Sequence, residues 1–236
     1  MAGHLEAIGF RGEAWEAAVM EASSKAAPCG RSDGFEHYLW QDASGARVLY
    51  HAKGSELLCV TPSFRSPKPS VWEVESCGPV LDDDCLHCGG GDFNVPDSRA
   101  AIQLELFAPW QRYLERRERF PMEVVGFAHW AQRCPDAAAI EKRVGLKLAA
   151  TSFIPVGMFG TEAKGMTQRA TALVAGRLEE VERLRNGQTG ADFLRLRVAA
   201  LPGALDVVSN LETLPGEGDI LLAEVWLVGR PQERKD

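Results

Sequence analysis

The last third of the chain constrains the fold most strongly, because strand-type alternation recurs there around one clear turn. Leu194, Leu196 and Val198 occupy every second position of one segment. Arg195 and Arg197 stand between them. A period of two puts the apolar set on one face of a strand, so we expect that face to be buried and both guanidinium groups to lie in water. The segment therefore predicts a half-buried β-strand.

A hairpin turn precedes this strand. Residues 185–190 read Arg-Asn-Gly-Gln-Thr-Gly, and asparagine and glycine tolerate the positive φ angles that tight turns require. Before the turn, residues 172–176 form a short apolar run that ends in glycine, and the spacing of Leu178, Val181 and Leu184 that follows also fits a helix. We interpret this run as a strand, because Gly176 and the turn leave little room for a helix and a glycine inside a strand commonly marks a bulge or bend.

Two further strands follow the hairpin. Residues 205–208 form a short apolar run, and residues 220–228 are apolar at nearly every position, as in a strand that closes a barrel. Glu224 is the single charge in the second run. If this carboxylate is buried it needs a partner such as Arg195 or Arg197, and otherwise it lies at a solvent-facing position.

These strands together predict a small antiparallel barrel that resembles the OB type, in a domain of residues 120–232 followed by a polar tail, residues 233–236. The first domain, residues 1–110, is expected to hold an alanine-rich N-terminal helix, residues 13–27. An antiparallel meander of three strands, residues 34–64, follows it. The fold class is therefore α+β and mostly β, with a charged, helical connector between the two domains.

Charge and hydropathy narrow the classes of partner. The chain has 236 residues and a formal net charge of −7, whereas sequence-independent nucleic-acid binding depends on an excess of Lys and Arg. A local basic cluster is interleaved with glutamates and fits a solvated helix face. It comprises Arg112, Arg116, Arg117 and Arg119. We expect neither a nucleic-acid nor a membrane partner, because no apolar run is long enough to span a bilayer.

The cysteines suggest the compartment and one possible cofactor. No secretory signal is visible, so a cytoplasmic protein is expected, and its six irregularly spaced cysteines then read as reduced thiols. Cys85 and Cys88 are spaced so that two thiolates can reach one tetrahedral zinc ion, with Cys77 as a third ligand. The fourth zinc ligand would then be one of His51, Cys59, His87 or Cys134, brought close by the folding of the chain.

Other interpretations of this segment stay open. The Cys85 and Cys88 pair also fits a redox dithiol, although the βαβ context of such pairs is missing. Alternatively, residues 77–91 form a polar, glycine-rich surface loop with incidental thiols. A zinc ion with three protein ligands and an open position would indicate catalysis, whereas a closed ligand set would indicate a structural site.

Several short motifs in the last 85 or so residues carry a resemblance to known proteins. They are Phe153-Ile154-Pro155-x-Gly157-x-Phe159, Ala170-Thr171-Ala172-Leu173-x-x-Gly176, Asn186-x-x-Thr189-Gly190-x-x-Phe193, Asp206-Val207-Val208 and Trp226-Leu227-x-Gly229-Arg230. In this order they are similar to a group of functionally uncharacterised bacterial proteins with a β-rich, OB-like C-terminal region. The resemblance implies a β-rich intracellular protein, and it carries over no catalytic residue and no substrate.

The sequence displays no nucleophile paired with a base, no carboxylate cluster and no cofactor fingerprint. We therefore favour a non-enzymatic binding or protein-interaction module that engages a protein or a small ligand. Exposed indoles would support an interface. The candidates are Trp40, Trp72, Trp110 and Trp130. The alternative is a zinc-binding protein or metal-dependent enzyme that uses Cys77, Cys85 and Cys88.

Overall fold

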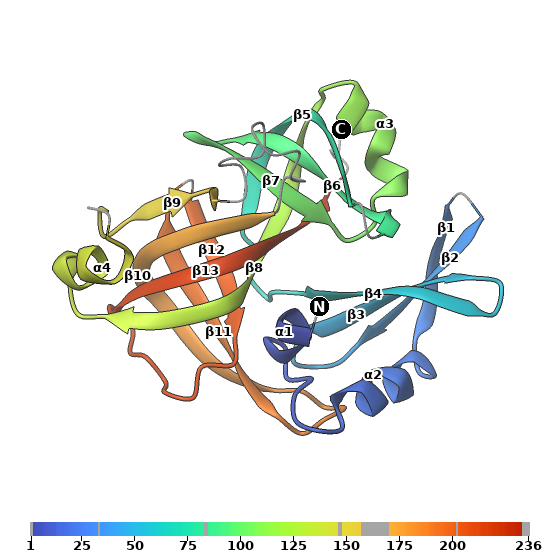
Figure 1. Ribbon diagram of the computed structural model, residues 1–236, viewed down its shortest axis with the longest axis horizontal. Helices are drawn as coiled ribbons and strands as arrows, with labels where there is room; N and C mark the ends of the chain where they lie inside the picture. The colour runs from blue at the N-terminus through green and yellow to red at the C-terminus, as the bar shows by residue number, and fades with distance from the viewer. Residues whose placement is uncertain are drawn as a thin grey trace.

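The structure is a computed structural model that describes residues 2–32, 34–82, 85–145, 148–156, 170–201 and 203–232. Strands make up 57% and helical residues 14% of it, so the mostly-β expectation is confirmed. Figure 1 shows a small sheet at one end of the molecule, and helix α4 (Ala137–Val144) at the other. The helical elements are α1 (Ala2–Glu6), α2 (Trp15–Ser23), η1 (Ala108–Trp110), α3 (Gln111–Glu115) and α4 (Ala137–Val144).

The N-terminal sheet is an antiparallel meander of four strands in chain order. Its strands are β1 (Ala27–Ser32), β2 (Phe35–Gln41), β3 (Ala46–Lys53) and β4 (Glu56–Phe64). The three expected strands are confirmed, and β1 is added at the edge. The predicted helix, residues 13–27, is shorter than expected, because Pro28 lies in β1 opposite Tyr38. An edge strand tolerates proline, which lacks the N–H that a central strand must donate.

The second sheet is mixed and has nine strands. They are β5 (Val71–Asp82), β6 (Cys85–Val95), β7 (Ser98–Leu104), β8 (Arg119–Cys134), β9 (Ser152–Ile154), β10 (Thr171–Arg185), β11 (Asp192–Ala200), β12 (Gly203–Ser209) and β13 (Ile220–Pro231). Hairpin neighbours pair antiparallel, whereas β12 pairs parallel with β8 and β7 pairs parallel with β13. Local turns fix only the hairpins, so the sequence did not reveal the two parallel pairs.

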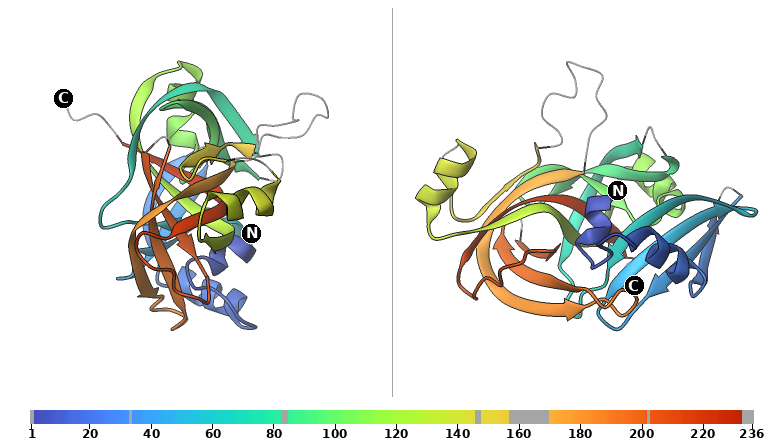
Figure 2. Two further views of the ribbon diagram at one scale, coloured as in Figure 1. Left: turned by 90° about the vertical axis from the view of Figure 1, so that its left-hand side faces the viewer. Right: turned by 60° about the horizontal axis from the view of Figure 1, so that its bottom comes forward.

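The strand pairs of this sheet close two rings that share β8 and β13. One ring runs β5, β6, β7, β13 and β8, and the other runs β8, β12, β11, β10 and β13. Figure 2 shows the long curved strands from two further sides. The first ring combines strands from both predicted domains, residues 1–110 and 120–232. The division into these domains stays a prediction.

Two large clusters of buried apolar side chains hold these layers together. One fills the space enclosed by the second sheet and includes Phe93, Met122 and Leu196. The other joins the first sheet and helix α2 to the outer side of β8 and includes Tyr50 and Phe127. The contact between helix and sheet is fixed by a hydrogen bond of 2.7 Å, which the hydroxyl of Tyr50 donates to the carbonyl of Val19.

The glycine-rich segment is not a surface loop, because β5 and β6 run through it. Gly90 and Gly91 are buried in β6. A Cβ atom at Gly90 would lie 2.2 Å from the carbonyl oxygen of Ile102, on the neighbouring strand β7. The glycines therefore permit a close approach of strands, which composition alone does not distinguish from a loop.

The hairpin of β10 and β11 confirms the predicted turn and the buried face of Leu194, Leu196 and Val198. The expectation that Arg195 lies in water is wrong, because its side chain is only 4% exposed. Carboxylates on the two flanking strands surround Arg195. The alternating pattern of one strand does not show which side chains the adjacent strands place beside it. Glu224 is partly exposed and accepts a hydrogen bond of 2.9 Å from the indole of Trp130, so neither Arg195 nor Arg197 is its partner.

Candidate functional site

A pocket of about 470 Å³ opens at the tip of the hairpin of β10 and β11. Three segments that are far apart in the chain form its wall: the stretch after α1, the hairpin tip and the stretch after β12. The lining residues are Arg11, Arg183, Arg185, Gly190, Ala191, Asp192, Phe193, Leu194, Leu211 and Glu212. Three cationic side chains thus meet in one hollow of a chain whose net charge is −7.

Asn186 fixes the shape of the hairpin tip. Its buried side chain donates a hydrogen bond of 2.8 Å to the carbonyl of Ile8. The oxygen of the same side-chain amide, Oδ1, accepts hydrogen bonds from the backbone N–H groups of Gln188 and Thr189, at 2.9 and 3.1 Å. The turn is therefore tied both to itself and to the segment that carries Arg11.

The N-terminal segment is pressed against this tip. Gly9 has a φ of +89°, and a Cβ atom there would lie 2.7 Å from the Cβ of Asn186. The hydroxyl of Thr189 donates a hydrogen bond of 2.8 Å to the carbonyl of Gly9. Only glycine meets both the positive φ and the close contact without strain, so the wall of the pocket is set before any ligand binds.

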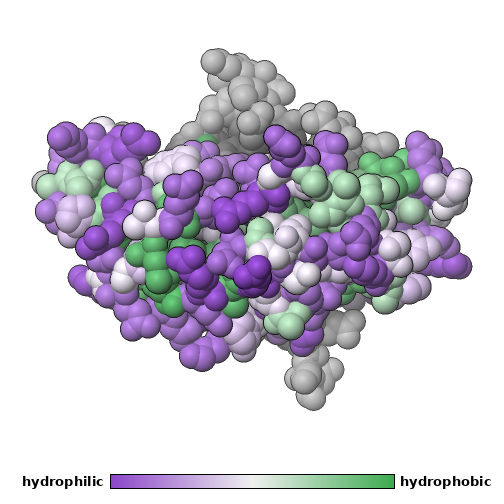
Figure 3. Space-filling view, turned by 90° about the horizontal axis from the view of Figure 1, so that it is seen from below, coloured by the Kyte–Doolittle hydropathy of each residue, from purple (hydrophilic) through white to green (hydrophobic). Residues whose placement is uncertain are grey.

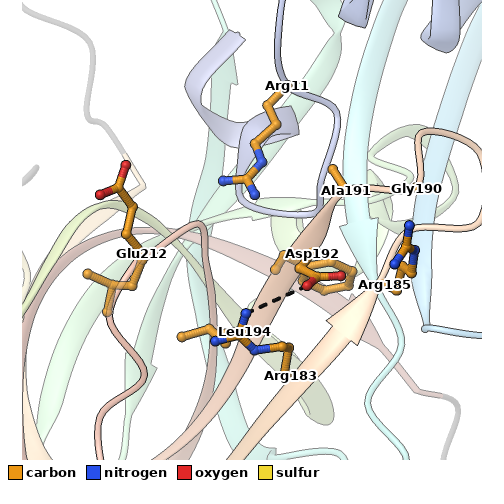
Figure 4. A pocket seen from close by; sticks show the side chains of 10 residues that line it. Arg11, Arg183, Arg185, Gly190, Ala191, Asp192, Leu194 and Glu212 are labelled. Carbon is orange, nitrogen blue, oxygen red and sulfur yellow. Dashed lines mark ion pairs between the residues drawn. The ribbon is translucent and has the colours of Figure 1, made fainter.

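The charges of the pocket are only partly balanced. Arg183 pairs with Asp192 at 3.6 Å. Arg11 and Arg185 are exposed and make no ion pair within the described parts of the chain. Figure 4 shows Arg11 and Arg183 on either side of the space beside Asp192, with Glu212 farther away. Three guanidinium groups against two carboxylates leave an excess of positive charge.

The donors of this arrangement suit the binding of an anion. Guanidinium groups present planar sets of N–H donors that match the oxygens of carboxylates and phosphates. The lining residues described here include no Ser, Thr, Cys, His, Lys or Tyr side chain that could act as a nucleophile. The three guanidinium groups can therefore contact an anion in this pocket.

The predicted zinc ligands are only partly described. Cys77 is a free thiol of intermediate exposure on β5. Cys85 and Cys88 belong to strand β6, but their side chains, like that of His87, fall outside what the structure describes. Among the side chains that it does describe, no three of His, Cys, Asp or Glu stand around one metal position. The ligand set of Cys77, Cys85 and Cys88 stays a prediction.

Three residues of metal-ligating types, two histidines and a cysteine, form a row across the N-terminal sheet. His37 on β2 pairs directly with His51 on β3, and His51 pairs directly with Cys59 on β4. The sequence pointed to His51 and Cys59 as possible ligands but not to His37. The register of the meander, which the turns between its strands set, was the signal that could have aligned all three.

The expected interface residues are less exposed than an aromatic docking surface requires. Trp40 and Trp72 are buried, and Trp110 and Trp130 are partly buried. On the face in Figure 3, hydrophobic residues gather in separate small patches within a largely hydrophilic surface. The four arginines of the basic cluster are all exposed, but they do not share one helix face. Arg112 lies on α3, whereas Arg119 begins strand β8 and forms an ion pair with Glu75 at 2.7 Å.

The chain matches no protein-family model and none of the curated proteins with which it was compared. The resemblance of its last 85 or so residues to uncharacterised bacterial proteins stays a prediction. None of the described helices is long and apolar enough to cross a membrane.

Proposed function

We propose that this chain is a non-enzymatic binding protein whose hairpin-tip pocket holds a small anion with carboxylate or phosphate groups. One observation carries the proposal: Arg11 and Arg185 line a pre-shaped hollow and make no ion pair in the described chain. An anionic ligand would supply the counter-charge that the described chain does not.

The surroundings of the pocket support this assignment. Asn186 and Thr189 hold the hairpin tip against the N-terminal segment through hydrogen bonds to Ile8 and Gly9. A binding wall that is already ordered loses less conformational entropy when the ligand arrives. An excess of arginine in an otherwise acidic chain also favours anions at this one place over general adsorption of polyanions.

Isothermal titration with citrate and with inorganic pyrophosphate tests the proposal. We expect saturable binding by the natural chain, weakened by added salt because the contacts are ionic. Arg11→Gln and Arg185→Gln should each reduce the affinity about tenfold or more, as expected for the loss of a hydrogen bond to a charged group. Arg116→Gln is the matched control, because Arg116 is exposed but lies outside the pocket.

Three results would contradict the proposal. Neither anion binds to the folded protein, or all three arginine variants bind as the natural chain does. Equal weakening in Arg11→Gln, Arg185→Gln and Arg116→Gln would indicate non-specific attraction, which also contradicts a built pocket.

We further propose that the ring of β5, β6, β7, β13 and β8 is an OB-type barrel. Three features support this assignment: five strands, a parallel pair between β7 and β13, and the helical segment η1–α3 between β7 and β8. The sequence placed such a barrel within residues 120–232 alone. An experimental structure that leaves the pair of β7 and β13 open would contradict this assignment.

A further inference from the structure

A short contact between two histidines joins the N-terminal helix to the second sheet. His4 lies on α1 and His129 on β8, and their Nε2 atoms lie 3.4 Å apart. The imidazole of His4 also stacks on the indole of Trp226, on β13, with the ring centroids 4.2 Å apart and the ring planes inclined by 8°. His4 therefore contacts both of the strands that the two rings of the second sheet share.

A bulge in β8 presents His129 to α1. The register between β13 and β8 shifts at this point, because Glu224 pairs with Trp130 whereas the next residue, Val225, pairs with Ala128. In the register that the structure describes, His129 is the extra residue and stands opposite no residue of β13. Bulges redirect a side chain in this way, so the backbone of β8 fixes the contact with His4.

The contact between the two imidazoles disfavours protons. One Nε2 atom must donate the hydrogen and the other must accept it, so at least one ring is neutral. Burial, the charge of His129 and the charge of the amino terminus together lower the pKa of His4 to about 3. Partial burial also lowers the pKa of His129, although Glu224 acts against this effect and the amino terminus adds to it. Both rings therefore take up protons less readily when α1 is docked than when it is released.

The end of α1 supports the wall of the hairpin-tip pocket. The carbonyl of Leu5 accepts hydrogen bonds from the backbone N–H groups of Ile8 and Phe10, at 3.2 and 3.0 Å. These two bonds close the turn that carries Gly9, and Gly9 presses against Asn186 at the hairpin tip. A displacement of α1 removes the acceptor of both bonds, so it loosens the segment that forms this wall.

We propose that His4 and His129 form a proton-sensitive latch, which holds α1 against β8 and β13 at neutral pH and releases it in acid. Histidine is the side chain whose ordinary titration falls in this range of pH. Because the docked helix binds protons less readily than the released one, docking weakens as the pH falls below the ordinary pKa of 6.5. Between pH 7 and pH 5, the docking equilibrium should fall about tenfold or more. A further consequence, weaker binding of anions in acid, rests on the proposed function.

Hydrogen exchange of single backbone amides, followed by NMR at pH 7, 6 and 5, tests the latch. Relative to the intrinsic rate at each pH, the protection of the Ile8 and Phe10 amides should fall about tenfold or more. Protected amides of β11 should keep their protection. His4→Gln removes the titrating ring of α1 and should abolish the fall. Glu6→Gln changes a carboxylate on the same helix, so it is the matched control and should retain the fall.

A titration of the natural chain keeps the test valid if His4→Gln fails to fold. The ring resonances of His4, followed by NMR, should titrate well below 6.5. An imidazole of His4 that takes up its proton near 6.5 in the folded protein would overturn the proposal. Two exchange results would also overturn it: protection of Ile8 and Phe10 that does not change with pH, or an equal fall in the natural chain and in folded His4→Gln.

Sulfate separates the latch from the proposed function, because the charge of this anion does not change between pH 7 and pH 5. We expect the natural chain to bind sulfate less tightly at pH 5 than at pH 7, and folded His4→Gln to lose that difference. Equal affinities of the natural chain at both pH values would contradict the link between the latch and the pocket. Failure of both sulfate and pyrophosphate to bind at pH 7 would contradict the pocket, and the exchange result, which needs no anion, then decides the latch alone.

Discussion

The hairpin of β10 and β11 carries arginines in its middle and at its tip, and the two groups lie in opposite surroundings. In the middle, Arg195 contacts Glu180, Glu182 and Asp206 at 2.6, 2.8 and 3.2 Å. At the tip, Arg185 is exposed and has no ion pair in the described chain. The same residue type on one hairpin is thus fully neutralised at one place and left with free charge at the other.

This difference in ion pairing separates a charged side chain that stabilises the fold from one that can bind a ligand. Burial by itself lowers the pKa of Arg195, but its hydrogen bonds and the three nearby carboxylates raise that pKa overall. A charge that is neutralised inside the protein has nothing left to offer a ligand. A charge held at a concave surface without a partner does, and the predictions below test this contrast.

Removal of the innermost carboxylate should have the largest effect. The side chain of Asp206 is 0% exposed and accepts from both Arg195 and Arg197. Asp206→Ala leaves Arg195 buried with fewer partners, so we expect the free energy of unfolding to fall by about 3 kcal/mol in urea titrations. Glu179→Gln, which removes an exposed partner of Arg197, should cost less than about 1 kcal/mol. Equal losses in both variants would contradict the contrast.

The hairpin tip should be the next most sensitive point. Asn186→Ala leaves the carbonyl of Ile8 and two backbone N–H groups without their partner. We expect a loss of about 2 kcal/mol in the free energy of unfolding, together with weaker binding of anions. Gln188→Ala in the same turn is the control and should stay within about 0.5 kcal/mol. If Asn186→Ala weakens stability without affecting affinity, the tip does not shape the pocket.

The sequence predicted these two regions unequally. The turn at residues 185–190 and the buried face of Leu194 were readable because turn chemistry and a period of two are local. The burial of Arg195 was not, since it depends on Asp206, which reaches it from the next strand. A local sequence pattern indicates which face of a strand a residue occupies. The pairing of that strand with its neighbours determines which side chains the residue contacts.

The candidate sites were still harder to foresee. Arg11 reaches the hairpin tip only because Gly9 allows the N-terminal segment to press against Asn186. His37 joins His51 and Cys59 only through the register of three strands. The Cys85 and Cys88 motif was visible because its two residues are close in the sequence. The sequence therefore pointed to sites made of residues close along the chain and missed sites whose residues only the fold brings together.

Acid should weaken the middle of the hairpin through Glu180. Hydrogen bonds from Lys68 and Arg195 lower the pKa of this carboxyl to about 2 in the folded protein. The unfolded chain binds the proton more readily, so this contribution to stability is present above the ordinary pKa of 4.5 and is lost as pH falls toward 2. When unfolding is measured at a series of pH values, the free energy of unfolding should fall less steeply with acid in Glu180→Gln than in the natural chain. Lys68→Gln should lie between the two. An unchanged slope in Glu180→Gln would contradict this assignment.

The smallest change in stability should come from the residue most important for binding. Arg185→Gln removes a guanidinium that makes no ion pair in the described chain and stands near Arg183 and Arg11. Its loss also relieves repulsion, so the free energy of unfolding should change by no more than about 0.5 kcal/mol. A loss in the free energy of unfolding as large as that of Asp206→Ala would mean that Arg185 stabilises the fold and is not available to bind a ligand. The contrast therefore requires that Arg185→Gln hardly changes the free energy of unfolding in urea but strongly reduces the affinity for anions. Asp206→Ala must instead strongly lower the free energy of unfolding and leave the affinity of the folded protein for anions nearly unchanged.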